Sequence, residues 1–321
     1  MSFVRTILGD VAADELRRCG AHEHIIIDTA YIAENYPDFL LDDIDAACVD
    51  LREFRDADGG WVIDTMPTGA GRSARKLAAT SQQSGVHIVC PTGLHLPLYY
   101  PPNHPMLSMD QEELAEVFVK EIAESVCDDA VQLPYRAGVV KVAGSHGKLT
   151  PHQRQAFAAA AETSRRTGCP IITHTEQGTA GEEQIRLLLD GGAPPRQVVL
   201  SHTDRLPDIA YHRCLLSSGV TLEYDHHFRT YLKDDSCPTA DLIAALVPEF
   251  PDQIVVGMDL ARRGYWHGHG GTPGLVWLLT VLPTLLKERG VSDDLIERIL
   301  THNPRRAFTF ATVFGGLKRC Q

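Results

Sequence analysis

Short apolar stretches alternate along the chain with longer segments of helical character. Each stretch is almost continuously hydrophobic and rich in β-branched residues, rather than strictly alternating between hydrophobic and polar positions. This pattern is typical of parallel strands that are covered on both faces. Eight such stretches each predict a strand, at residues 20–28, 60–65, 86–91, 138–143, 169–173, 197–201, 220–224 and 253–257.

The segments between these strands predict helices. The clearest is 150–166, where Thr150 and Pro151 open an Ala-rich run and Gly168 follows its end, as expected for a capped helix. Further helices are predicted at 110–127, 238–250, 272–289 and 292–302.

This order of elements predicts the fold class. Eight βα units without a linker between them predict an α/β protein, a single-domain (β/α)8 TIM barrel over residues 1–321. An open, doubly wound sheet is the alternative, but no G-x-G-x-x-G sequence follows an early strand.

The composition of the chain limits the classes of partner that we expect. The chain has 321 residues, with 30 Lys and Arg against 42 Asp and Glu, giving a formal charge of −12. Such an excess of acid argues against a nucleic-acid or membrane partner and favours a small-molecule substrate. No apolar run reaches the ~20 residues of a membrane span, and the first residues lack the apolar core of a signal peptide. Eight Cys without a C-x-x-C pair suit reduced thiols, so we expect a cytoplasmic protein.

Chemically reactive side chains recur where the predicted strands end. In a (β/α)8 barrel the carboxyl ends of the strands hold the active site. A lone His is more often structural, a buried Lys often pairs with an acid, and an Asp often caps a helix. Taken together, however, six such positions indicate a metal centre. They are His22, His24, Lys141, His174, His202 and Asp259.

The sequence around these residues resembles the phosphotriesterase-like branch of the amidohydrolase superfamily, which includes the phosphotriesterase-like lactonases. The resemblance runs along nearly the whole chain. The matching stretches are 20–25 (GAHEHI), 64–65 (DT), 67–72 (PTGAGR), 141–143 (KVA), 173–175 (THT), 200–204 (LSHTD) and 257–259 (GMD).

The resemblance implies a binuclear metal centre bridged by Lys141, carboxylated on its amine by CO₂. The more buried metal would take His22, His24 and Asp259, and the more exposed metal would take His174 and His202. Zn²⁺ is the expected ion, and the same donors suit Mn²⁺, Co²⁺ or Fe²⁺.

The resemblance also implies the reaction. A hydroxide held between the metals would attack the substrate, and Asp259 would take its proton and pass it to the leaving group. Asp259 and Lys141 are therefore the predicted catalytic residues. A homodimer is a further expectation that rests on the resemblance alone.

The loops after the strands predict the substrate. Arg229 and Lys233 lie in the loop after strand seven, at 225–233, and Arg262 and Tyr265 lie in the loop after strand eight. Cations and phenols there suit an anionic group, although surface ion pairs and packing are the alternatives. Relatives that open phosphorylated sugar lactones are similar here, with a Tyr three residues after an Arg. The loop after strand three adds two candidate donors, Tyr99 and Tyr100.

The sequence therefore predicts a metal-dependent lactonase that opens a small hydrophilic lactone, such as a phosphorylated sugar lactone. Three alternatives stay open. They are an acyl homoserine lactonase or phosphotriesterase (aryldialkylphosphatase), an N-acyl amide hydrolase, and a barrel that binds without catalysis.

Overall fold

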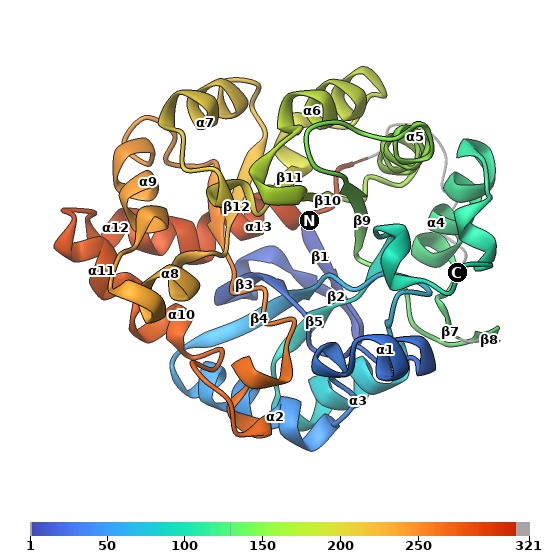
Figure 1. Ribbon diagram of the computed structural model, residues 1–321, viewed down its shortest axis with the longest axis horizontal. Helices are drawn as coiled ribbons and strands as arrows, with labels where there is room; N and C mark the ends of the chain where they lie inside the picture. Colours follow the sequence, from blue (N-terminus) through green and yellow to red (C-terminus); the bar gives the residue numbers. More distant parts are fainter. Residues whose placement is uncertain (1, 129, 313–321) are drawn as a thin grey trace.

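In the computed structural model, which describes residues 2–128 and 130–312, helices surround a group of central strands (Figure 1). The strands are β1 (Phe3–Thr6), β2 (Gly9–Ala12), β3 (Arg18–Glu23), β4 (Gly59–Asp64), β5 (His87–Val89), β6 (Pro91–Leu94), β7 (Cys127–Asp128), β8 (Val131–Gln132), β9 (Val139–Gly144), β10 (Ile171–Thr175), β11 (Val198–Ser201), β12 (Thr221–Tyr224) and β13 (Ile254–Val256).

The central strands form two parallel sheets. One has six strands in the order β13-β12-β11-β10-β9-β6, and the other has three in the order β3-β4-β5. All eight predicted strands are present, and the third is split into β5 and β6 at Cys90. The split coincides with Pro91, which has no N–H to donate to a sheet. The mixed α/β class with parallel strands is thus confirmed.

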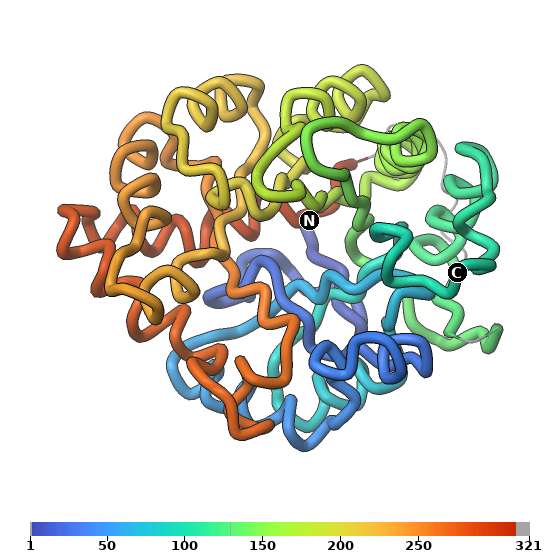
Figure 2. Tube along the Cα trace, in the orientation of Figure 1, coloured from blue at the N-terminus to red at the C-terminus, as the bar shows by residue number. Residues whose placement is uncertain are grey.

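The two sheets meet at both of their edges. On one side, Cys90 links β5 of the smaller sheet directly to β6 of the larger. On the other side, the backbone N–H groups of Asp259 and Met258 donate to the carbonyl of His22, at 2.9 and 3.3 Å. Figure 2 shows the same approach, with the segment after β13 (orange) running beside the first part of the chain (blue).

The helices follow most of the central strands. They are α1 (Ala30–Asn35), α2 (Ile44–Asp56), α3 (Ala74–Ser84), α4 (Gln111–Ala123), α5 (Pro151–Thr167), α6 (Gly181–Asp190), α7 (Ile209–Leu216), α8 (His227–Asp234), α9 (Pro238–Leu246), α10 (Trp277–Thr280), α11 (Leu282–Glu288), α12 (Asp293–Glu297) and α13 (Asn303–Phe308), with a π-helical turn at Arg298–His302.

Local sequence signals explain the helices that were predicted best. Helix α5 begins with a capping box, in which Thr150 and Gln153 each bond the backbone of the other. It ends at Gly168, whose φ of 74° is the left-handed conformation that glycine adopts without strain. An equivalent box between Asp110 and Glu113 starts α4.

Two predictions for the second half of the chain were wrong, one of a helix and one of a loop. The helix predicted at 272–289 begins only at Trp277 and is divided into α10 and α11. Pro283 lies in the first turn of α11, and because it lacks an N–H it interrupts the hydrogen bonding of a continuous helix. Likewise, most of the segment expected to be a loop after strand seven forms helix α8.

Two apolar clusters hold these layers together. An inner cluster includes Val139, Ile172, Val199 and Val255 from neighbouring strands, whereas Val140 and Leu200 belong to an outer cluster shared with the helices. This alternation places every second strand residue inside. The N-terminal hairpin of β1 and β2 covers the amino ends of the strands, so the carboxyl ends are left for a site.

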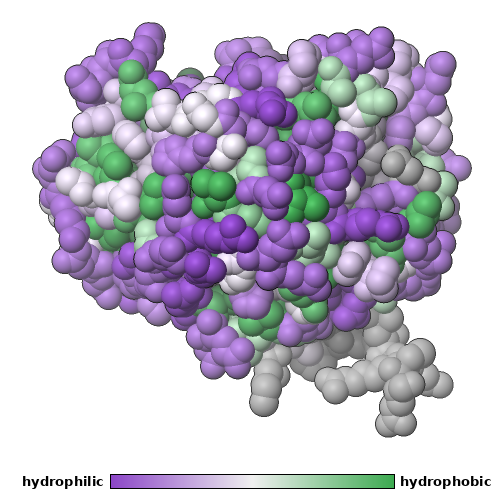
Figure 3. Space-filling view, turned by 90° about the horizontal axis from the view of Figure 1, so that it is seen from below, coloured by the Kyte–Doolittle hydropathy of each residue, from purple (hydrophilic) through white to green (hydrophobic). Residues whose placement is uncertain are grey.

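The surface is mostly polar. On the described part of the face drawn in Figure 3, hydrophobic residues occur in small, separate groups. Every helix among the described residues is too short or too polar to cross a lipid bilayer.

Candidate metal centre

The six side chains predicted as metal ligands lie at the same end of the central strands. His22 is on β3 with His24 just beyond it, Lys141 is on β9 and His174 is on β10. Of the remaining two, His202 directly follows β11 and Asp259 lies three residues past the end of β13, and their φ values are 63° and 47°. Such left-handed backbone is uncommon outside glycine and concentrates at functional sites.

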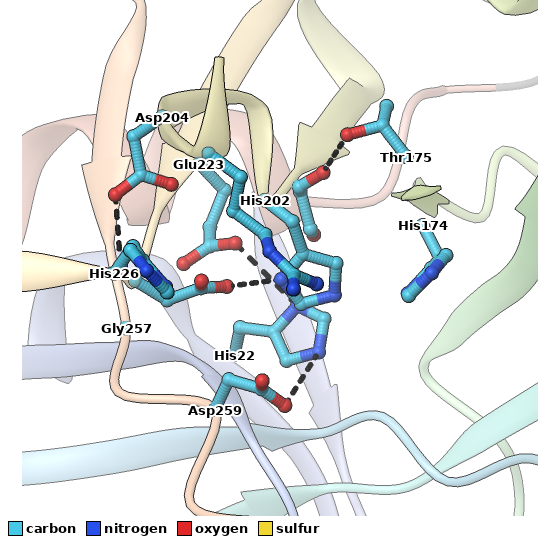
Figure 4. A network of polar contacts seen from close by, with 12 residues as sticks. His22, His174, Thr175, His202, Asp204, Glu223, His226, Gly257 and Asp259 are labelled. Atoms are coloured by element: carbon cyan, nitrogen blue, oxygen red, sulfur yellow. Dashed lines mark hydrogen bonds and ion pairs between the residues drawn. The ribbon is translucent and has the colours of Figure 1, made fainter. Parts of the chain in front are cut away.

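The structure brings these six side chains into contact. Nζ of Lys141 lies 3.4 Å from Nε2 of His22, and Nε2 of His24 lies 3.2 Å from Oδ1 of Asp259. The ring of His202 lies next to two of the other three imidazoles, with its centre 4.5 Å from that of His22 and 4.6 Å from that of His174. Figure 4 shows these rings converging from different strands.

Lys141 is fully buried, and no carboxylate of the described residues lies close enough to form an ion pair with it. Apart from His22, its only polar neighbour within hydrogen-bond distance among these residues is the carbonyl of Thr173, at 3.5 Å. Burial lowers the pKa of Lys141 to about 8. An unpaired ammonium in such a place is costly, so this lysine is suited to a chemistry other than a structural ion pair.

The donors present fit divalent cations. Burial holds the pKa of His22 well below its usual value and lowers that of His174 to about 4, so both imidazoles are neutral and each has a nitrogen lone pair for a cation. Nδ1 of His22 and Nδ1 of His24 are buried and have no hydrogen-bond partner in the described part of the chain. Imidazole nitrogens with the carboxylate of Asp259 form a set that Zn²⁺ and similar ions accept.

An arginine controls the charge of Asp259. Nη2 of Arg229 lies 2.9 Å from Oδ2 of Asp259, and the guanidinium also donates to the carbonyl of Asp225 at 2.8 Å. Burial opposes ionisation, but Arg229, His24 and His202 together outweigh it and hold the pKa of Asp259 well below its usual range. The carboxylate is therefore ionised at neutral pH.

A cavity of about 220 Å³ opens above these groups. Of the predicted substrate residues, Arg229, Arg262, Tyr265 and Tyr99 line it, and Tyr100 and Lys233 do not. The Tyr100 hydroxyl is buried, donating to the carbonyl of Thr68 and accepting from the N–H of His95. The full lining is His24, Phe39, Met66, His95, Tyr99, His174, Glu176, His202, Arg205, Asp225, His226, Arg229, Asp259, Ala261, Arg262 and Tyr265.

Several lining residues were missed by the sequence analysis. His95 follows β6, and its Nδ1 accepts the N–H of Leu96 at 2.7 Å, so its ring proton lies on Nε2. Glu176 contacts Nε2 of His174 at 3.0 Å, and Arg205 lies 4.0 Å from Glu176. A polar residue just past a predicted strand was the available signal for His95, but nothing in the sequence marked Arg205.

A second group of possible ligands lies away from this cavity. Asp50, Glu53 and His267 are close enough to hold an ion. Asp50, however, accepts the backbone N–H groups of His267, Gly268 and Leu275, and Nδ1 of His267 lies 2.6 Å from Glu53. These contacts fasten the loop after β13 to α2.

The parallel sheets and the imidazoles, carboxylate and lysine at their carboxyl ends define a protein of the metal-dependent hydrolase class. Residues 2–308 match the phosphotriesterase family, and the chain belongs to this family. The predicted resemblance is therefore confirmed. The family depends on a binuclear metal centre, and the chain is a hydrolase that acts on ester bonds.

The similarity to characterised relatives covers nearly the whole chain. A phospho-furanose lactonase from Mycoplasmopsis synoviae is 30% identical over 324 residues, which cover 96% of this chain and 92% of that protein. The structure of a lactonase from Listeria monocytogenes has a TM-score of 0.89 and 30% identity, covering 97% of this chain and 100% of that one. The structure of a phosphotriesterase homology protein from Escherichia coli, complexed with phosphate in its active site, has a TM-score of 0.82 and 27% identity. The match covers 91% of this chain and 98% of that one.

Proposed function

We propose that this chain is a metal-dependent lactonase whose two parallel sheets close as one (β/α)8 barrel around the site. The observation that carries the function is the environment of Lys141, a buried amine 3.4 Å from Nε2 of His22 that has no ion-pair partner among the described residues. Carboxylation of that amine by CO₂ would turn it into an anionic ligand. The contacts of Asp259 and Met258 with His22 support closure of the barrel.

Each residue then has a role. His22, His24 and Asp259 would hold one metal, His174 and His202 the other, and carboxylated Lys141 both. Such a pair of ions polarises an ester carbonyl and makes water nucleophilic at neutral pH. Asp259, which lies 2.9 Å from Nη2 of Arg229, would accept a proton and return it to the leaving oxygen as the ring opens.

We further propose that the lactone carries an anionic group, such as the phosphate of a phosphorylated sugar. Three arginines, Arg205, Arg229 and Arg262, line the cavity. Of these, Arg262 is the most accessible. It pairs with Asp38 on the surface at 2.7 Å, and its guanidinium stands 4.6 Å from the ring centre of Phe39. The phosphate in the active site of the Escherichia coli relative supports an anion at this position.

A substrate panel tests this function. The Zn²⁺-loaded protein is assayed against a phosphorylated sugar lactone, the same lactone without phosphate, an acyl homoserine lactone, an aryl dialkyl phosphate and an N-acyl amino acid. We expect the highest kcat/KM for the phosphorylated lactone. Highest activity on the N-acyl amino acid, or none on any compound, would contradict the proposal.

Two neighbouring arginines provide a matched test of the anion site. Arg262→Ala is expected to raise KM for the phosphorylated lactone about tenfold or more, the loss of a hydrogen bond to a charged group. KM for the unphosphorylated lactone should hardly change. Arg263→Ala is the control, because Arg263 bonds the carbonyl of Leu40 and does not line the cavity.

A further inference from the structure

Glu223 is a buried acid at the centre of the molecule that the roles above do not use. It lies on β12 between Leu222 and Tyr224, which belong to the outer apolar cluster, so its own side chain points inward. Both of its carboxyl oxygens are buried without a hydrogen-bond partner. Burial, followed by the nearby Asp225, raises the pKa of Glu223 well above its usual value. A buried carboxyl without a hydrogen bond destabilises the folded protein, so we expect Glu223 to have a role that offsets this cost.

The carboxyl of Glu223 faces the imidazole of His22. Oε2 of Glu223 lies 3.5 Å from Nδ1 of His22, a nitrogen that is itself buried without a hydrogen-bond partner. The opposite nitrogen, Nε2, lies 3.4 Å from Nζ of Lys141 and 3.9 Å from Oδ1 of Asp259. His22 thus has one nitrogen toward Glu223 and the other toward Lys141 and Asp259; Figure 4 shows its ring between Glu223 and Asp259.

The end of the same strand places a second acid behind a second imidazole. Asp225, two residues further along, holds Nδ1 of His202 at 2.5 Å. Alternation along the chain directs residues 223 and 225 to the same side. Two predicted ligands therefore each have a carboxyl at Nδ1, from β12 for His22 and from the residue directly after β12 for His202.

The neighbouring strand leaves room for this arrangement. A Cβ at Gly257 would lie 2.9 Å from Oε1 of Glu223 and 2.6 Å from the backbone nitrogen of His22. Both distances are too short for any side chain at this position. A glycine after β13 is thus required for Glu223 and His22 to approach each other.

We propose that Glu223 is a positioning residue for the metal centre, which accepts a hydrogen bond from Nδ1–H of His22. The contact fixes the ring proton on Nδ1 and leaves the lone pair of Nε2 for the cation, as outer carboxyl groups do for ligating histidines. A carboxyl group retains an acceptor oxygen whether ionised or protonated, so the contact does not depend on its charge. This inference rests on the proposed function only in that a metal binds at Nε2.

A direct role is the competing explanation. Ligand atoms of His22, His202, Glu223 and Asp225 lie within 4.8 Å of one another and could hold an ion themselves. In that case Glu223 would be a ligand, a third cation would bind, and the amide of Gln could not replace the carboxylate.

Zn²⁺ binding separates these possibilities. Wild type, Glu223→Gln, Glu223→Leu and Asp204→Asn are compared for Zn²⁺ per chain and for Zn²⁺ affinity against a competing chelator. Glu223→Gln keeps an acceptor oxygen and Glu223→Leu does not. Asp204 is the matched control, a buried acid that bonds the N–H of His226 and the hydroxyl of Thr239 instead of an imidazole.

We expect two Zn²⁺ per chain, about 10–100-fold weaker binding of one of them in Glu223→Leu, and affinity close to wild type in Glu223→Gln and Asp204→Asn. Nitrogen-15 spectra of the metal-free protein provide a second readout, with the His22 proton on Nδ1 in wild type and Glu223→Gln. Equal affinity in all four proteins, equal loss in both Glu223 variants, or a third Zn²⁺ in wild type would overturn the proposal. Because these measurements involve no substrate, they remain decisive even if the lactonase activity is absent.

Discussion

Two buried polar clusters in this protein differ in how completely their groups are satisfied. Around Arg72, every charge has a partner. The guanidinium contacts both carboxylate oxygens of Glu121 at 2.7 and 2.8 Å and also bonds Asp128 and backbone carbonyls. Around Lys141, the ammonium has no acid partner among the described residues, and the oxygens of nearby Glu223 have no hydrogen bond.

The difference in pairing distinguishes a cluster that stabilises the fold from one that is suited to bind a ligand. A buried charge that is fully paired is self-sufficient, and its neighbours require nothing further. A buried amine beside unsatisfied imidazoles is costly as it stands and becomes favourable only when something else binds. We therefore interpret the Arg72 cluster as a support for the fold and the Lys141 cluster as the proposed metal centre. The predictions below test this contrast.

The largest effect is expected at Lys141. Lys141→Met should abolish both metal binding and hydrolysis, because a thioether cannot be carboxylated to bridge two ions. Without metal, however, the variant should be at least as stable as metal-free wild type, since an unpaired buried amine has been removed. Metal analysis, turnover and thermal unfolding of the metal-free proteins measure this. Two metals per chain in the variant would contradict it, and restoration by a short-chain carboxylate would strengthen it.

At Glu121 we expect the reverse of the Lys141 result, a loss of stability without a loss of metal binding or turnover. Glu121→Gln leaves Arg72 buried without its main partner and should lower the free energy of unfolding by about 3–5 kcal/mol. Metal content and kcat of the folded fraction should stay near wild type, because neither residue lines the cavity. Denaturant unfolding at neutral pH measures the loss. A variant as stable as wild type would show that the pair contributes little.

The pair also predicts a pH dependence. Burial opposes ionisation of Glu121, but Arg72 outweighs it and lowers the pKa of Glu121 below the usual 4.5. A carboxyl whose pKa is lower in the folded state stabilises the fold above its unfolded pKa and loses this contribution as the pH falls through the folded value. Wild type should therefore lose more stability than Glu121→Gln on acidification below about pH 4.5. Parallel curves for the two proteins would refute this.

The smallest effect is expected at Thr68. Its hydroxyl donates to Glu121 at 2.6 Å and accepts from Arg72 at 2.8 Å. Thr68→Val keeps the shape and removes these bonds, so we expect a loss of about 1–3 kcal/mol, the range for a hydrogen bond to a charged group. Thermal unfolding measures it. A larger loss than in Glu121→Gln would reverse the proposed order of importance within the cluster.

Much of the fold and the centre of the site could be predicted from the sequence. The strands were found because apolar, β-branched runs are local signals. Helix α4 was found from its apolar residues at helical spacing, and α5 from Pro151 at its start and Gly168 past its end. His22 and His24 were found because a strand repeats every two residues. The helix at 272–289 failed because a single Pro283 interrupted an otherwise helical pattern.

The partners of each side chain could not be predicted in this way. Lys141 meets His22 across 119 positions, and Arg72 meets Glu121 across 49, so no local pattern distinguishes a paired charge from an unpaired one. The same applies to the loops, where Arg205 reaches the cavity and Lys233 does not.

The sequence by itself determined the order of strands and helices and the residue types at the strand ends, because both depend on spacing along the chain. The tertiary structure alone decided that Lys141 lacks an acid, that Glu223 lies behind His22, and which arginines line the cavity. These facts depend on the direction of each side chain and on burial, which are fixed only when distant strands pack side by side.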